Sequence, residues 1–244
     1  MSYGQNKPWG LQAIETQSNS SWNGQMATYL IESGYGQNIF KGDLVYIDAN
    51  GYLRNLFDLI NVLPITGQTI PGYADSPAIG VFNGCQYTVP TAVSPVDPAS
   101  PGRPFWPANT LTLGNAPAVA DVIIDPTVLY NAQVTGNVGA TQDSCGKYAY
   151  VTYQETSPGS GIVAGNTNTG QSYVSINIDS ATRTTGVVDA VPAIVANTPS
   201  TYAFLFNCYI DSLSTDSRNV SGQLYNNVQV LINNHYFRVM RTLV

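Results

Sequence analysis

Proline and glycine recur so often along this chain that long helices are excluded, and no other feature constrains the fold as strongly. The sequence has 22 glycines and 15 prolines among 244 residues, and neither residue is well tolerated inside a helix. No window carries a sustained apolar stripe of helical period, whereas several segments alternate apolar and polar residues as half-buried strands do. The sequence therefore predicts an all-β fold, an antiparallel β-sandwich or barrel-like domain with an extended N-terminal arm and long Pro/Gly-rich loops.

Strands are expected wherever apolar residues alternate or run continuously between turn residues. Tyr148–Tyr153 forms a strand-like run between glycine-rich stretches. The run at 203–210 is almost continuously apolar and aromatic, as in a strand that is covered on both faces. The other predicted strands cover 26–32, 43–48, 79–87, 118–124, 128–134, 173–178 and 228–232.

Three pairs of neighbouring strands are predicted to form hairpins. Asn50-Gly51 gives the strongest signal, because this dipeptide accepts the positive φ angles that tight turns need. Asp125-Pro126-Thr127 separates two alternating runs and predicts a second hairpin over 118–134. Asn233-Asn234 predicts a terminal hairpin that ends at 236–240.

The strand at 79–87 is expected to lie at the centre of the fold. Gly80 and Gly84 fall on the same side of its alternation and remove side-chain bulk from that face. Such gaps let a bulge, a bend or another backbone come close. We expect Trp106 to fill this gap and to pack with Phe82 beneath the proline-rich loop at 90–108.

Composition along the chain suggests three regions, which are an N-terminal arm at 1–25, a central β domain at 26–155 and a C-terminal β region at 171–244. The stretch at 155–170 is rich in glycine, serine, threonine and asparagine, as linkers are. The C-terminal region could also pack into the same domain as the central one.

The arm carries large apolar residues without either regular period, so it cannot form a self-sufficient element. These residues need a surface from the parent domain or from a neighbouring subunit. If they contact a neighbour, deleting residues 2–24 should leave a folded protein. Together with two aromatic residues that follow the proline-rich loop, they are the candidates for partner contact: Trp9, Leu11, Ile14, Trp22, Phe105 and Trp106.

Sparse charge limits the classes of partner. Only 10% of residues are charged and the formal net charge is −6, while 16 tyrosines supply adhesive contact area. No basic run is present, which argues against nucleic-acid and anionic-membrane partners, because both require clustered cations. The first residues lack a signal-peptide pattern, and no apolar stretch is long enough for a membrane helix, so we expect a protein that is made in the cytoplasm.

Motifs for catalysis or metal binding are not found. Cys85, Cys145 and Cys208 are widely spaced, and His235 is the only histidine, beside a predicted turn. No nucleophile elbow, phosphate loop or zinc motif occurs, so we expect no cofactor, no metal and no enzymatic activity. Paired carboxylates for glycoside hydrolysis can come from distant positions, which leaves four acidic residues open: Asp121, Asp125, Glu155 and Asp179. Their neighbours argue against catalysis, because Asp125 fits a turn, Asp121 sits at an exposed strand position and Glu155 precedes a loop.

A series of short motifs resembles the capsid decoration, or cement, proteins and minor head proteins of tailed bacteriophages. The likeness spans roughly residues 40–240. It rests on Gly80-Val81-Phe82-x-Gly84-x-x-Tyr87, the proline-rich loop, Trp106-Pro107, Ala120-x-Val122-x-x-Asp125-Pro126, a Gln-ended strand, Gln171-Ser172-Tyr173 and Val230-Leu231-Ile232-Asn233-Asn234-His235-Tyr236. The resemblance implies a non-catalytic component of the virion surface.

The expected function is therefore a structural one. The protein would bind the outer surface of an assembled head, contact the major capsid protein and bridge its subunits as a homo-oligomer, with a trimer favoured over a dimer. A head or tail fibre component, a neck component and a glycan-binding module for host contact are the alternatives.

Overall fold

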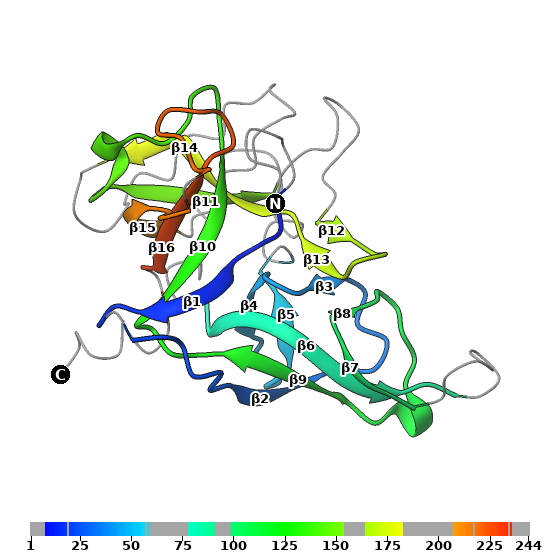
Figure 1. The fold of residues 1–244 in the computed structure, drawn as a ribbon. Helices are drawn as coiled ribbons and strands as arrows, with labels where there is room; N and C mark the ends of the chain where they lie inside the picture. Colours follow the sequence, from blue (N-terminus) through cyan, green and yellow to red (C-terminus); the bar gives the residue numbers. More distant parts are fainter. Residues whose placement is uncertain are drawn as a thin grey trace.

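The computed structural model describes residues 8–18, 20–56, 58, 78–90, 99–153, 164–182, 207–216, 218–233 and 235. Strands and their connections make up nearly all of these residues, so the predicted all-β class is confirmed. Figure 1 shows two groups of strands, one above the other, with β1 (Gln12–Thr16) lying between them. The described residues contain no helix long and apolar enough to span a membrane.

The upper group is a sheet that closes on itself. Its strand order is β1-β10-β14-β11-β15-β16, and β10 also pairs with β16, which makes a barrel of five strands with β1 added outside. Only the β10–β14 pair is parallel. The bounds are β10 (Val128–Thr135), β11 (Tyr148–Tyr153), β14 (Val174–Thr182), β15 (Asn207–Leu213) and β16 (Asn227–Ile232).

The lower group is an antiparallel sheet in the order β2-β9-β6-β4-β5, with β7 beside the second half of β6. A two-stranded ribbon of β3 and β8 lies against β6. The bounds are β2 (Ala27–Ile31), β3 (Ile39–Phe40), β4 (Leu44–Ile47), β5 (Leu53–Asn55), β6 (Gly80–Thr88), β7 (Ala99–Arg103), β8 (Phe105–Trp106) and β9 (Ala118–Ile123). The short hairpin of β12 (Gly165–Asn166) and β13 (Gln171–Ser172) lies beside β3.

The two groups of strands share buried surface. The barrel core continues into Leu44, Val81 and Ile123 of the lower sheet, while a second core fills the space between that sheet and the β3–β8 ribbon. The linker-like stretch at 155–170 falls between β11 and β14, which pair with each other in the barrel. Strands from both predicted β regions therefore belong to one sheet, which is the packed arrangement that the sequence left open.

The predicted hairpin at Asn50-Gly51 is confirmed. β4 and β5 pair antiparallel with Ile47 opposite Leu53. Only Gly51 takes a positive φ, 83°, and Asp48 closes the turn by accepting hydrogen bonds from the backbone N–H groups of Asn50 and Tyr52, both at 2.9 Å. A side-chain cap of this kind stabilises the turn without positive φ at Asn50.

The predicted hairpin of β9 and β10 is wrong, because the two strands belong to different sheets. Asp125 does form a turn, since its Oδ1 accepts hydrogen bonds from the backbone N–H and the hydroxyl of Thr127. No residue from 124 to 128 has positive φ, which the usual two-residue hairpin turns require. The chain therefore turns a corner from the lower sheet into the barrel.

The two glycines of β6 do allow backbones to come close, but Trp106 is not what fills the space. A Cβ at Gly80 would lie 2.1 Å from the carbonyl oxygen of Ile123, and one at Gly84 would lie 2.9 Å from that of Arg103. Both neighbours are backbone groups of the paired strands β9 and β7. The start of the predicted strand at 203–210 and the terminal hairpin at 236–240 lie outside the described residues.

Candidate functional site

The described part of the predicted arm packs on its own chain. β1 pairs antiparallel with β10 from Gln12 to Thr16, opposite Asn131 to Val128. Leu11 is buried within the barrel core, and Ala13 packs against that core. The sequence allowed the arm to pack on its parent domain or on a neighbouring subunit, and Leu11 packs on the parent domain.

The other apolar residues of the arm are placed differently from one another. Trp22 is half-buried against the barrel core, and Trp9 is also half-buried. Both indole Nε1 atoms are shielded from solvent without a hydrogen-bond partner. Ile14 is 36% exposed and is the predicted arm residue most accessible to a partner.

Phe105 and Trp106, which the sequence also suggested as partner contacts, both pack against aromatic residues of their own chain, and Trp106 belongs to the second core. Trp106 is fully buried, makes a T-shaped contact with Tyr87 at 5.0 Å between centroids, and donates its Nε1–H to the Tyr35 carbonyl at 3.4 Å. Phe105 is half-buried and stacks on Phe40 with a centroid distance of 5.4 Å. Trp106 lies in the same core as the equally buried Phe82, but its aromatic contact is with Tyr87.

An exposed group of aliphatic residues, which sequence reasoning missed, lies at one end of the β2–β9 pair. Leu30 and Val119 face each other across these strands and are 44% and 40% exposed. Leu111 and Leu113, both 57% exposed, belong to the loop that follows β8. We call Leu30, Leu111, Leu113 and Val119 the aliphatic patch.

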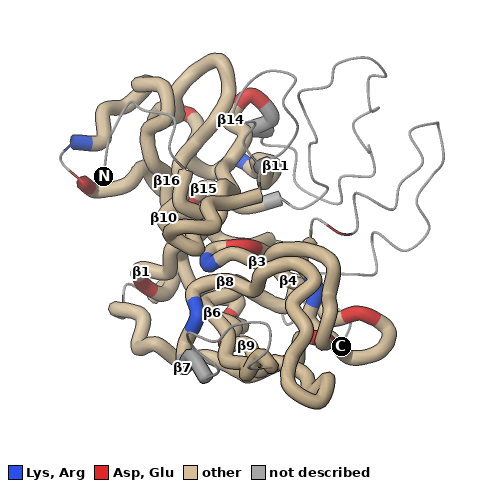
Figure 2. Tube along the Cα trace, turned by 90° about the vertical axis from the view of Figure 1, so that its right-hand side faces the viewer, with Lys and Arg blue, Asp and Glu red and all other residues tan. Residues whose placement is uncertain are grey.

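Hydrogen bonds hold this loop against the end of β2. The backbone N–H of Gly34 donates to the Thr110 carbonyl at 2.8 Å, and the Thr112 N–H donates to the Ser33 hydroxyl at 3.1 Å. The strand alternation at 26–32 contained the signal for Leu30, but not the information that Leu30 stays 44% exposed in the fold. In Figure 2 the charged residues appear as short blue and red segments along a mostly tan chain.

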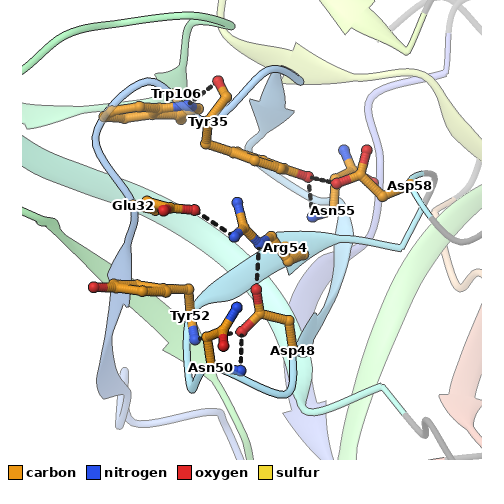
Figure 3. Close-up of polar contacts among 9 residues, drawn as sticks. All are labelled: Glu32, Tyr35, Asp48, Asn50, Tyr52, Arg54, Asn55, Asp58 and Trp106. Carbon is orange, nitrogen blue, oxygen red and sulfur yellow. Dashed lines mark hydrogen bonds and ion pairs between the residues drawn. The ribbon is translucent and has the colours of Figure 1, made fainter.

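Arg54 of β5 lies at the centre of a polar network with Glu32, Tyr35 and Asp48 (Figure 3). Its guanidinium donates to Asp48 at 2.7 Å and to Glu32 at 2.5 Å, and it lies 4.7 Å from the centroid of the Tyr35 ring. Tyr35 in turn donates its hydroxyl proton to Asp58. The network thus ties β5 and its hairpin to the end of β2, across the open side of the lower sheet.

The pKa directions in this network fit a structural role. Burial alone would raise the pKa of Asp48, but hydrogen bonds from the Tyr52 N–H and from Arg54 outweigh it and lower that pKa. Burial opposes the charge of Arg54, yet hydrogen bonds to Glu32 and Asp48 raise its pKa. Burial raises the pKa of Tyr35 and of Asp58, and Tyr35 and Arg54 act against the shift at Asp58. The arginine is therefore held charged between two carboxylates.

Replacing Arg54 with methionine should lower the free energy of unfolding by about 2–3 kcal/mol, because Asp48 would lose its charged partner. Urea unfolding measures this. The loss should shrink as pH falls below about 4, since Asp48, with its lowered folded pKa, contributes stability only above that range. Arg218→Met is the control, because its ion pair with Asp216 is exposed and should contribute at most about 0.5 kcal/mol. Equal losses for the two variants would contradict a structural role for Arg54.

Two of the acidic residues that the sequence left open for catalysis, Asp125 and Asp179, have local partners, and Asp121 lies half-buried in β9. Asp125 caps its turn, and Asp179 accepts hydrogen bonds from the backbone and side-chain amides of Asn137. Glu155 lies outside the described residues. Within the described chain, no group of three His, Cys, Asp or Glu side chains is placed to hold a metal ion.

Cys85, Cys208 and His235 are buried, and Cys145 is half-buried. All three cysteines are free thiols, and burial raises the pKa of both Cys85 and Cys208 to about 12, so these two thiols stay protonated. His235 was expected at a turn or an edge, but it is buried and forms a β-bridge to Ala78.

No family model, curated protein or solved structure matches this chain. The function therefore has to be inferred from the chain's own residues. Among the surfaces described above, the aliphatic patch best combines exposed apolar area with a rigid support.

Proposed function

We propose that this protein is a structural component of a tailed-phage head, which binds the outer surface of the assembled shell and bridges neighbouring capsid subunits. The sequence motifs that resemble capsid decoration proteins suggest the partner. The observation that carries the proposal is the aliphatic patch, which presents Leu30, Val119, Leu111 and Leu113 on a sparsely charged surface.

The patch has the physical properties of a docking surface. Apolar side chains release water when a partner covers them, at about 25 cal/mol for each Å² removed from solvent. The chain as a whole carries few charges, but Glu32, Asp121 and Arg103 lie close to the patch, so a partner would have to offer them polar groups to limit the desolvation cost. The β2–β9 ladder and the hydrogen-bonded loop fix the backbone that carries the four residues before binding, so little backbone entropy is lost.

Bridging would come from repetition of such weak contacts. A homo-oligomer, for which we favour a trimer over a dimer, would present several patches at once to neighbouring capsid subunits. Linked contacts act at high effective concentration, so their combined affinity exceeds that of any single patch. Such a clamp would reinforce the shell without catalysis, cofactor or metal.

Polar substitution of the patch should weaken binding to undecorated capsid shells by at least about tenfold, which corresponds to losing the burial of one or two aliphatic side chains. The test variant carries Leu30→Thr, Val119→Thr, Leu111→Ser and Leu113→Ser, and shell binding is measured by cosedimentation.

The matched control replaces Val138 and Val220 with threonine, since both valines are similarly exposed, at 58% and 57%, outside the patch. The control should keep both its affinity and its melting temperature. Unchanged shell binding by the patch variant would show that the contact lies elsewhere. If the full-length protein bound fibres, tails or host glycans and not shells, the capsid proposal itself would fail.

A further inference from the structure

An open pocket of about 290 Å³ adjoins the aliphatic patch. Its walls come from the end of β6, the end of β7 and the loop that follows β8. The residues used below are Tyr87, Val89, Arg103, Asn109, Thr110 and Leu111. Leu111 belongs to both the pocket and the patch, so a partner that covers the patch also reaches the pocket.

Arg103 gives the pocket its chemistry. Its guanidinium lies over the Tyr87 ring, 4.8 Å from the ring centroid. No carboxylate in the described residues pairs with it, and its Nε atom is shielded from solvent without a hydrogen-bond partner. A guanidinium carries five N–H donors in a planar fork that matches a carboxylate. The fold therefore leaves the half-buried Arg103 without a carboxylate, and because its Nε is shielded, a ligand in the pocket would have to bind the terminal Nη groups.

Tyr87 supports Arg103 and leaves little ring surface for a ligand. Arg103 covers one face of the ring, and the ring also contacts the buried Trp106. Tyr87 itself is only 8% exposed. A sugar that binds by stacking needs an open aromatic face, so the pocket favours an ionic ligand over a stacked one.

The part of the pocket wall that comes from the loop after β8 is held in place by hydrogen bonds before any ligand binds. The Asn109 N–H donates to the Tyr35 carbonyl at 2.8 Å, and the Thr110 hydroxyl donates to the Pro107 carbonyl at 2.7 Å. Asn109 is exposed and can offer its side-chain amide to a ligand. Fixed walls reduce the entropy that binding costs.

We infer that this pocket binds a carboxylate side chain, Asp or Glu, that a partner protein presents next to an aliphatic residue. The carboxylate accepts hydrogen bonds from Arg103 and Asn109, and the aliphatic neighbour packs on Leu111 and Val89. Charge-assisted bonds of this kind give orientation as well as affinity. The inference rests on the proposed function for its setting, because the capsid surface would supply this acidic segment.

The pocket is tested first with small probes on the full-length protein. N-acetyl-Leu-Glu-amide is titrated while the Arg Nε–H signals are followed by NMR. The Arg103 signal should shift, and the affinity should exceed that for N-acetyl-Leu-Gln-amide by about tenfold or more, as expected for a charged acceptor in place of a neutral one. Equal binding of both peptides would overturn the inference. N-acetylneuraminic acid is the third probe, and tighter binding of this acidic sugar than of the acidic peptide would overturn the choice of a protein ligand.

Variants separate binding from folding. Arg103→Gln should lose the preference for the acidic peptide, Arg103→Lys should keep only part of it because lysine lacks the fork, and Arg218→Gln should bind as the parent does. Melting temperatures check that each variant folds, and a folded Arg103→Gln variant that kept the full preference would contradict the inference.

The same variants distinguish this inference from the capsid proposal. Arg103→Gln should weaken shell binding. If the parent bound shells and Arg103→Gln bound them equally well, the pocket would not contact the capsid although the proposed function stood. If the parent bound the acidic peptide but no shells, the proposed function would fail while the carboxylate site remained.

Discussion

Replacing Trp106 with alanine is expected to lower the free energy of unfolding by about 3–5 kcal/mol, because a fully buried indole leaves a large cavity. The loss includes its T-shaped contact with Tyr87 and its hydrogen bond to the Tyr35 carbonyl. The first contact joins the β3–β8 ribbon to β6 of the lower sheet, and the second joins it to the connection between β2 and β3. Urea unfolding, followed by the intrinsic fluorescence of the remaining tryptophans or by circular dichroism, measures the change.

Phe105→Ala is the matched control for Trp106, since it removes the neighbouring aromatic residue of the same short strand. Phe105 is half-buried, so its loss should amount to about 1–2 kcal/mol. If Trp106→Ala cost less than about 1 kcal/mol, the indole would not be enclosed in solution. Contact with a partner would then explain Trp106 better than core packing does.

Leu11→Ala is expected to destabilise the fold by about 2–4 kcal/mol, because Leu11 is 3% exposed and fills part of the barrel core. Ile14→Ala, a few residues along in β1, should cost less than about 1 kcal/mol because Ile14 is partly exposed. Thermal unfolding of the two variants compares them directly. If Leu11→Ala kept its stability but weakened association between chains in sedimentation experiments, the arm would contact a neighbouring subunit.

This packing also changes the expected result of deleting residues 2–24. The sequence led us to expect a folded remainder, because the arm had no regular period. The deletion would remove β1 from its pairing with β10 and Leu11 from the core. Point variants of the patch therefore test shell binding more cleanly than truncation does.

Strand positions could be predicted from the sequence because alternation is a local property. β6 and β14 follow from the residues within each strand, and Gly51 supplies the backbone freedom of its own turn. Pairing is not local. The alternation around Asp125 was correct for two strands, but nothing within that segment shows that β9 pairs with β6 and β10 with β16.

The functional surfaces were harder to predict for the same reason. Arg54 contacts Asp48 within its own hairpin, but it reaches Glu32 only once the end of β2 lies beside β5. Arg103 approaches Tyr87 only because β7 pairs with β6. Large aromatic residues in polar segments suggested exposed anchors, yet Trp106 is buried. Hydrophobic character favours burial as strongly as contact with a partner, and only the packed fold separates the two outcomes.

The most direct test of the central claim is the number and position of copies of this chain in purified phage heads, measured by electron cryomicroscopy. A cement protein should appear many times, in a fixed ratio to the major capsid protein, on the outer surface where capsid subunits meet. The aliphatic patch should face the shell. A few copies at a single vertex, or density confined to the neck, tail or fibres, would contradict the proposal.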